Sequence, residues 1–575
     1  MKKGQIITNI TVEKVGFGGV GIGVMADGKK VLIKWSVLPH SVIDCVVIQS
    51  KRDHIMAMPH RVVSIDPTWA DATPLCPHYS NPLVIIPDDQ IHKNGCGGCK
   101  RQLLSYPRQL DMKTELVHDS FRQASYLIDK VWLQTIIPSP VTYHYRNKIE
   151  FSFGKYITKT RNDRKNKGLR EGDLPDGSQG MREWETDEKE FSHRFDRQLG
   201  FHKQGFYTHV VDVDQCYLIS QSLHEVYAHI KMLCQESGLS VHDSKTHEWF
   251  FRHLVMREGV NTHNILVNLV VANDVADSLS THEREEQRKE LKDIFATDAL
   301  LRKQVTTFMI TYNNTVSDAV SWKDTQQDIL RGEWYIFEEL HFARRQEVIE
   351  DEDDTAFVIE DGQMKASTKK QSLRLTSKSG SDMMVQTIRF RVSAFSFFQT
   401  NTLGAQELFS KAASMISLSW SRSTILDLYC GAGTIGLSFV AMGIGKFCIG
   451  IELVEDAIRD AKVNAQLNKM DDKSYFVAGK AEVLVSRDRQ ISDKMSDIGL
   501  IIVDPPREWL HKDVVEFLIG LRQNHRCQLL YISCNPVTLA RDLDLLVQGG
   551  WECTVLQPVD MFPHTHHVEM ISVLG

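Results

Sequence analysis

The chain has 575 residues, of which 42% are hydrophobic and 25% are charged, and its formal net charge is −7. This length is too great for one hydrophobic core, so several domains are expected, and the composition is typical of a soluble globular protein. No apolar run approaches the length of a membrane span, and the first residues hold no apolar signal-peptide segment. A cytoplasmic monomer with no membrane partner is therefore expected. The negative charge does not by itself indicate a nucleic-acid partner, but the acidic run 350–354 supplies five of the negative charges, so the remaining chain is close to neutral.

Residues 1–65 alternate short β-rich runs with glycine turns, such as Gly-Phe-Gly-Gly at 16–19 and Asp-Gly at 27–28. This pattern predicts a small β-barrel of the OB type, a fold that often binds RNA. Another five-stranded β domain without RNA binding would give the same pattern.

Residues 66–395 mix helical and strand patterns, which favours an α+β central domain. Two stretches, 159–190 and 343–381, are rich in charged residues, Gly and Ser and poor in core residues, so we expect disordered insertions there. Between residues 143 and 153, Arg146 and Lys148 lie among aromatic residues, as on a strand face that contacts RNA. An ordinary amphipathic strand is the alternative interpretation.

Four of the 11 cysteines look organised, while the odd total argues against a secreted disulfide framework. The pair in Cys-Gly-Gly-Cys is compatible with a redox pair, half of a zinc site or half of an iron–sulfur site. The four are Cys76, Cys96, Cys99 and Cys216.

From residue 396 onward, strands alternate with helical patterns. The predicted strands cover 423–430, 446–453, 498–506 and 527–534, and amphipathic segments lie between them. This series predicts an α/β domain over 396–575, with a doubly wound, parallel sheet of the Rossmann-like type.

A cofactor site is predicted at the first strand-to-helix turn of this domain. The turn carries Gly-x-Gly-x-x-Gly at 431–436, and Glu452 ends the next strand, where an acid binds ribose hydroxyls. A dehydrogenase would satisfy this motif equally well. Asp427 before the turn, and Asp-Pro-Pro at 504–506 after a later strand, favour S-adenosylmethionine (SAM) instead, because two prolines form a rigid lip beside a planar base.

Cys534 lies where the apolar run 529–532 ends and Asn-Pro begins, at the open end of a buried strand. Carbon 5 of uracil becomes nucleophilic only when a group adds to carbon 6, and a thiolate is suited to that addition. A general base must then remove the proton on carbon 5. Glu569, at the start of the last strand-like run, is a candidate for that base.

The C-terminal motifs, taken together, resemble those of the RNA uracil-5-methyltransferase family. The resemblance is dense over the C-terminal domain and extends into the middle of the chain through "YRNKIEFSFG" and "RHLVMREG". It implies that Cys534 is the nucleophile and Glu569 the general base. It also implies a SAM and base pocket lined by Gln399, Tyr429, Glu452 and Asp504, which Thr434 could join. The motifs, in chain order, are "FSFFQTN", "LDLYCGAGTIGL", "GIEL", "IIVDPPR", "YISCNPVTLARDL" and "DMFPHTHHVE".

Two positions depart from the family pattern. Lys480 lies where the family often has Asp or Asn against the adenine, and Glu508 follows Asp-Pro-Pro-Arg where a glycine is usual. The adenine contact is therefore in doubt, whereas the chemistry is not. His564, His566 and His567 are compatible with a zinc site, but no further ligand set accompanies them.

The ribosomal-RNA branch of this family carries a [4Fe-4S] cluster on four cysteines and an N-terminal TRAM barrel. The resemblance therefore implies a cluster on the four organised cysteines and 23S ribosomal RNA as the substrate. Transfer RNA is the alternative substrate. A non-catalytic RNA-binding protein with a retained SAM fold is the alternative of another class, and intact Cys534 and Glu569 argue against it.

Overall fold

The computed structural model describes residues 1–79, 95–122, 124, 132–154, 198–203, 206–237, 239, 250–272, 281–313, 325–343, 356–360, 363–367, 385–416, 423–506 and 510–575. The expected insertion 159–190 lies outside the described residues. Within 343–381, where an unstructured insertion was expected, β15 (Ala356–Glu360) pairs antiparallel with β16 (Gln363–Ser367). Among the described residues, no helix is both long and apolar enough to cross a bilayer.

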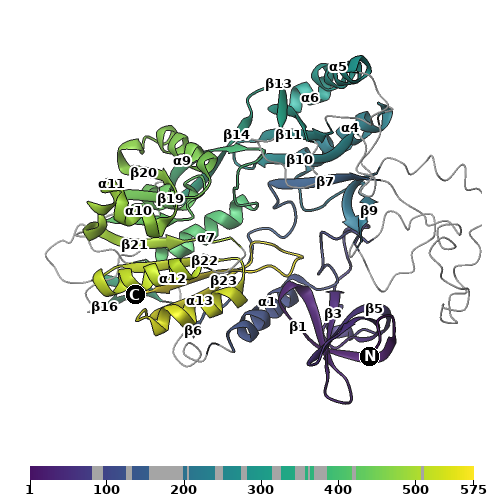
Figure 1. Cartoon of the computed structure of the whole chain (residues 1–575), viewed down its shortest axis with the longest axis horizontal. Helices are drawn as coiled ribbons and strands as arrows, with labels where there is room; N and C mark the ends of the chain where they lie inside the picture. Colours follow the sequence, from purple (N-terminus) through teal and green to yellow (C-terminus); the bar gives the residue numbers. More distant parts are fainter. Residues whose placement is uncertain are drawn as a thin grey trace, which may run out of the picture.

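The N-terminal strands form a closed barrel in the order β1-β2-β3-β5-β4, as predicted (Figure 1). Alternate residues of the first strand, such as Ile10 and Val12, are buried, because one face of each strand lines the barrel interior. The strands are β1 (Ile6–Val15), β2 (Val20–Val24), β3 (Lys30–Ser36), β4 (Val42–Ser50) and β5 (His54–Ser64).

The central domain is built on a seven-stranded mixed sheet in the order β13-β12-β11-β10-β7-β8-β9. Only β11 and β12 pair in parallel within it; the other described pairs are antiparallel. Its strands are β7 (Lys148–Gly154), β8 (Gln198–Lys203), β9 (Phe206–Asp212), β10 (Phe251–Gly259), β11 (Asn264–Val271), β12 (Thr307–Tyr312) and β13 (Gln326–Arg331). The helices are α4 (Gln221–Glu236), α5 (Thr281–Thr297) and α6 (Ala299–Gln304), so the domain is α+β.

The C-terminal domain holds an eight-stranded sheet in the order β20-β19-β18-β21-β22-β24-β23-β6. The pairs from β20 to β22 are parallel, and β24 is antiparallel to both β22 and β23. The strands are β18 (Thr424–Leu428), β19 (Phe447–Glu452), β20 (Ser474–Ala478), β21 (Ile498–Val503), β22 (Gln528–Ser533), β23 (Cys553–Val559) and β24 (Glu569–Leu574). The helices are α7 (Thr402–Ser414), α8 (Thr434–Ala441), α9 (Glu455–Leu467), α10 (Ala481–Arg487), α11 (Arg489–Ser492), α12 (Lys512–Asn524) and α13 (Pro536–Gln548).

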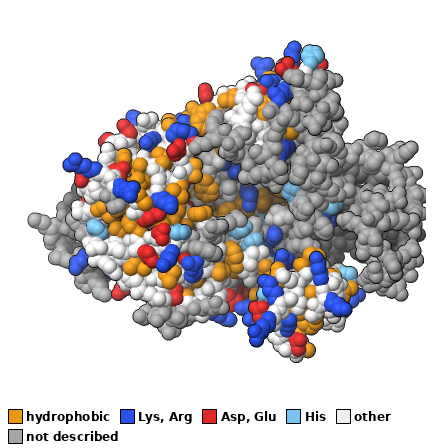
Figure 2. All heavy atoms as spheres, in the orientation of Figure 1, with side chains coloured by type: hydrophobic (Ala, Val, Ile, Leu, Met, Phe, Trp, Pro, Cys, Tyr) orange, Lys and Arg blue, Asp and Glu red, His pale blue; other side chains and the backbone are white. Residues whose placement is uncertain are grey.

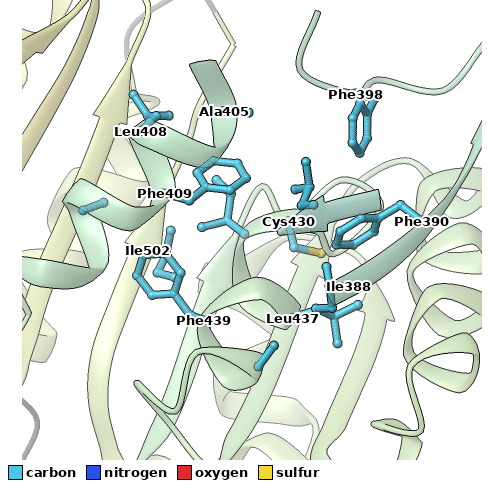
Figure 3. Close-up of a cluster of buried hydrophobic side chains, with 14 of the residues drawn as sticks. Ile388, Phe390, Phe398, Ala405, Leu408, Phe409, Cys430, Leu437, Phe439 and Ile502 are labelled. Atoms are coloured by element: carbon cyan, nitrogen blue, oxygen red, sulfur yellow. The ribbon is translucent and has the colours of Figure 1, made fainter. Parts of the chain in front are cut away.

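Each face of this sheet has its own hydrophobic core. One core joins α7 and α8 to Ile532 and Ile571 of the sheet, and Figure 3 shows Phe398 lying over Phe390 and Ile388 in the same cluster. The other core packs α12 and α13 against the opposite face. Because both faces are covered, the inner strands are apolar throughout, as in β21.

Segments from the first part of the chain also cover the C-terminal domain. β6 (Trp132–Leu133) pairs in parallel with β23 at the sheet edge, and α1 (Tyr106–Phe121) lies beside α13 (Figure 1). Two further strands, β14 (Tyr335–Ala343) and β17 (Val385–Ser393), pair antiparallel with each other. β6 thus extends one edge of the C-terminal sheet, whereas β14 and β17 pack against its helices α7 and α9.

Candidate active site

The glycine turn between β18 and α8 brings the backbone close to the sheet. Gly431 and Gly433 have φ angles of 53° and 77°, a left-handed conformation that favours glycine. A Cβ atom on Gly436 would lie 2.4 Å from Cys448 Sγ and 2.8 Å from Asp427 Oδ2, so no larger residue fits there without a shift. Tyr429 also has a positive φ, of 62°, and such strain in a non-glycine residue is typical of functional sites.

Glu452 is held at this turn by its own hydrogen bonds. Its Oε2 accepts from Gly431 N at 3.3 Å, and its Oε1 accepts from Leu453 N at 2.7 Å and Val454 N at 3.0 Å. The Leu453 and Val454 side chains are 60% and 56% exposed, which leaves apolar surface beside the carboxylate. A ribose hydroxyl pair and an adenine ring need this combination of an acid and an apolar surface. Lys480 is exposed, and it is the N-cap residue immediately before α10 at the neighbouring strand end.

Two more carboxyl groups lie at the same strand ends. Burial raises the pKa of Asp504 to about 7. Burial also raises the pKa of Asp427 to about 8, with smaller contributions from the charges of Asp504 and Glu452. Asp427 Oδ2 accepts from Gly436 N at 3.0 Å, whereas its buried Oδ1 has no hydrogen-bond partner. Carboxyl groups crowded in this way favour a cationic ligand, and the close glycine turn beside them fits a sulfonium cofactor such as SAM.

Cys534 occupies the two-residue junction between β22 and α13. Asn535 caps the helix, because its Oδ1 accepts from Val537 N at 3.1 Å, and Pro536 provides the first helical residue. Cys534 is partly exposed, whereas Cys527 and Cys553, at the other end of these strands, are buried. The local structure therefore presents this thiol at the edge where the cofactor turn lies.

Glu569 begins β24 and is only 5% exposed. The antiparallel register pairs Ser533 with Met570, so one further step along the ladder sets Cys534 beside Glu569. Side chains alternate between faces, and the pair Ile532 and Ile571 belongs to the core that contains Phe398. Cys534 and Glu569 therefore lie on that face of the sheet as neighbours, so a nucleophile and a base stand side by side.

Comparison with known proteins matches this geometry to a family. The family model for tRNA (Uracil-5-)-methyltransferase matches residues 289–574. Residues 289–574 of the chain therefore belong to the RNA uracil-5-methyltransferase family. An uncharacterized RNA methyltransferase of Caldanaerobacter subterraneus is 28% identical over 574 residues, covering 100% of this chain and 99% of the relative. One of Bacteroides thetaiotaomicron is 28% identical over 544 residues, covering 94% of this chain and 95% of the relative.

A solved structure has the same fold. It is the Pyrococcus abyssi tRNA (uracil-54, C5)-methyltransferase in complex with S-adenosyl-L-homocysteine, with a TM-score of 0.58 and 21% identity. The match covers 98% of this chain and 100% of that chain. This match establishes the fold, and the family model together with the named relatives makes the protein an RNA methyltransferase.

The loop that carries Gln399 joins the methyltransferase domain to the central domain. Asn147 Nδ2 donates to Gln399 O at 2.8 Å. Asn401 caps α7 by accepting from Gly404 N at 2.8 Å, and its Nδ2 donates to Met561 O at 2.9 Å. The Gln399 side chain is buried, while Phe397 beside it is 70% exposed. The structure thus holds the "FSFFQTN" segment on the face that Cys534 and Glu569 share.

The four organised cysteines are close enough to influence one another. Burial raises the pKa of Cys96, and the nearby Cys99, Cys216 and Cys76 raise it further. None of the four forms a disulfide, and Cys96 N donates to His78 O at 3.0 Å while Cys76 N donates to Gln102 Oε1 at 3.0 Å. Four thiols are a donor set that fits an iron–sulfur cluster. Among the described residues, no group of three or more His, Cys, Asp or Glu is arranged to hold a metal ion.

The two basic residues predicted to contact RNA, Arg146 and Lys148, are partly buried. Arg146 is partly buried next to Cys99 and Cys216, and it lowers the pKa of both thiols slightly. Lys148 pairs with Arg257 across β7 and β10, and burial together with that neighbour lowers the pKa of Lys148 to about 8. Figure 2 shows Lys, Arg and His side chains in the centre of one face, between the barrel and the larger domains.

Two histidines of the last motif, His564 and His566, have pKa values well below their ordinary value. Burial lowers the pKa of His564 to about 4 and that of His566 to about 3. His564 stacks on Tyr143 with 4.3 Å between the ring centroids, and Phe17 of the barrel meets His566 edge-on at 6.1 Å. Sequence reasoning did not predict these contacts, since nothing in the motif indicates which distant segment covers it.

Proposed function

We propose that this protein is a 23S rRNA (uracil-C5)-methyltransferase that acts through a covalent bond between Cys534 and carbon 6 of the target uracil. The observation that carries the proposal is the pairing of Ser533 with Met570, which sets Cys534 and Glu569 next to each other on one face. A nucleophile and a base at adjacent positions are what methylation at an unactivated carbon requires.

In the proposed reaction, the Cys534 thiolate adds to carbon 6 and carbon 5 becomes nucleophilic. When bound, SAM supplies the methyl group that carbon 5 takes up. Glu569 then removes the remaining proton from carbon 5. The electron pair of that C–H bond restores the double bond between carbons 5 and 6, and the bond from carbon 6 to sulfur breaks to release the thiolate.

The other pocket residues bind and orient. Glu452 would accept hydrogen bonds from the ribose hydroxyls of the cofactor, because its carboxylate is already held at the glycine turn. Gln399, Tyr429 and Asp504 would line the remaining wall of the pocket for SAM and the base. The base must leave its stack to reach this pocket.

We further propose that Cys76, Cys96, Cys99 and Cys216 hold a [4Fe-4S] cluster with a structural or RNA-contacting role. The donor chemistry of four thiols, none of which is in a disulfide, supports this assignment. The N-terminal barrel would be a TRAM domain and would bind RNA beside it.

The cysteines and the barrel favour ribosomal RNA, but transfer RNA is a second candidate. The Pyrococcus abyssi protein is a tRNA (uracil-54, C5)-methyltransferase, and its match covers 98% of this chain. A protein of this fold can therefore act on tRNA, so the choice between the two RNAs depends on an assay.

The assay is methyl transfer from labelled SAM to unmodified 23S rRNA and tRNA transcripts, with wild-type protein and Cys534→Ala in parallel. We expect transfer to uracil C5 of 23S rRNA by the wild type alone. Transfer to tRNA instead would replace the substrate and keep the chemistry. Transfer by Cys534→Ala at the wild-type rate would exclude the covalent mechanism.

A further inference from the structure

The loop that leads into Glu569 is held mainly by residues from outside its own domain. We call residues 560–568 the base loop, because they connect β23 to β24 and end immediately before Glu569. Several of its hydrogen bonds run to α1 and to the segment that follows Cys99. The position of Glu569 therefore depends on parts of the chain far away in the sequence.

The first anchor is a buried ion pair at the start of the base loop. Lys113 Nζ lies 2.6 Å from Asp560 Oδ1, and the two side chains are 3% and 0% exposed. The same Nζ donates to Phe562 O at 3.0 Å, and Tyr106 OH donates to Asp560 Oδ2 at 3.0 Å. Both Tyr106 and Lys113 belong to α1, so one helix holds this end of the loop by three bonds.

The second anchor lies in the middle of the base loop, at His564. Gln109, also on α1, accepts from His564 N through its Oε1 at 2.7 Å, and its Nε2 lies 3.2 Å from His564 Nδ1. Lys100 N, next to Cys99, donates to His564 O at 2.8 Å. His564 needs this support, because its φ of 64° is a strained conformation for a residue other than glycine.

We propose that α1 positions the general base: Lys113 and Gln109 hold the base loop so that Glu569 faces the uracil carbon from which it removes the proton. This inference rests on the proposed function, since it assigns the same base to Glu569. Lys113 and Gln109 are both buried and bonded to the base loop, so both are positioning residues.

The positioning role concerns one step of the reaction. Addition of Cys534 to carbon 6 and methyl uptake at carbon 5 do not use Glu569, whereas proton removal does. A displaced base loop therefore delays breakage of the bond between carbon 6 and sulfur, and the methylated RNA stays attached to Cys534. Even a displacement of about 1 Å can slow a step on the order of 100-fold.

The test compares two readouts in one single-turnover experiment. RNA labelled with tritium at uracil C5 reports proton removal as tritium released to water, and labelled SAM reports methyl transfer. For Lys113→Met and for Gln109→Leu, we expect methyl transfer within about threefold of wild type and tritium release slower by about 10- to 100-fold. A covalent protein–RNA band should accumulate on a denaturing gel.

Lys231→Met is the matched control. Lys231 forms a buried ion pair with Asp212 at 2.8 Å in the central domain, and its described bonds do not involve the base loop. This variant should lose stability as Lys113→Met does, but its two readouts should stay coupled. Gln109→Leu changes no charge, so it keeps the test valid if Lys113→Met does not fold.

The possible failures are distinguishable. If Glu569→Gln separates the two readouts but Lys113→Met and Gln109→Leu do not, the positioning role is wrong and the proposed function stands. If wild type and Glu569→Gln form no adduct that depends on Cys534, the proposed function itself is wrong.

Discussion

The end of the C-terminal sheet that carries the glycine turn and Cys534, here called the edge, differs from the base loop in how far apart its residues lie in the sequence. The edge uses short contiguous motifs, each at the end of a strand of one sheet, such as the glycine turn after β18 and Cys534 after β22. The base loop is held by partners far away in the sequence: Lys113 and Asp560 are 447 residues apart, and Gln109 and His564 are 455 residues apart. Reactive groups are thus supplied locally, whereas the placement of one of them depends on the assembly of the whole chain.

The largest expected effect concerns Glu569, which follows the base loop and lies beside Cys534 at the edge. Glu569→Gln keeps the shape of the side chain but removes the base, so steady-state turnover should fall on the order of 10²- to 10⁴-fold. The covalent complex with RNA should accumulate at the same time, measured on a denaturing gel. Glu552→Gln, which is exposed just before β23, is the matched control and should turn over at about the wild-type rate. Equal turnover by Glu569→Gln and wild type would show that another group removes the proton.

The sequence could predict the edge because each of its motifs is local. Strand ends, glycine turns and the order of parallel strands follow from periodicity, and parallel strands bring their carboxyl ends to one side. Predicting Glu569 from position alone was harder, because its place depends on the antiparallel register of β24. Its position at the start of the last strand-like run made it a candidate, and the resemblance of "DMFPHTHHVE" to the family implied its role as the base.

The contacts of the base loop could not be predicted for a physical reason. Lys113 and Gln109 lie on a helix whose pattern is simply amphipathic, and a buried lysine resembles a surface lysine until its partner is known. The strained φ of His564 likewise has no signal in the sequence, since glycine would be the usual choice. Pairing across such a distance requires the tertiary structure.

A second prediction tests whether the cysteines next to the base loop hold metal. Cys96→Ser should reduce the iron content of anaerobically purified protein from about four atoms per chain to near zero, with loss of the brown colour. Iron analysis and the visible absorption spectrum would measure this. Cys234→Ser, at a buried cysteine on α4 outside the set, should keep its iron. Zinc in place of iron in the wild type would contradict the cluster assignment.

The third prediction concerns how SAM affinity at this edge depends on pH. Since burial raises the pKa of Asp504 from 3.8 to about 7, its contribution to stability is fully present below pH 3.8 and is lost as the pH rises through about 7. Only the ionised carboxylate attracts a sulfonium cation. SAM affinity should therefore rise about tenfold between pH 6 and pH 8, as measured by calorimetry.

Asp504→Asn removes the ionisable carboxyl group, so SAM affinity should rise less between pH 6 and pH 8. Asp427, whose pKa burial raises to about 8, would retain part of it. An unchanged pH dependence in Asp504→Asn would assign the titration to another group.

The smallest expected effects compare a glycine of the edge with one remote from it. Gly436→Ala places a Cβ 2.4 Å from Cys448 Sγ and 2.8 Å from Asp427 Oδ2, so we expect the free energy of unfolding to fall by about 1–3 kcal/mol and SAM binding to weaken. Gly520→Ala, in α12, meets no atom within 4 Å and should raise the free energy of unfolding by about 0.5–1 kcal/mol. Urea unfolding with and without SAM would measure both. If the two variants change the free energy of unfolding in opposite directions, the glycine of the turn is required by close packing under the cofactor rather than by helix propensity. If both change it in the same direction, that distinction is lost.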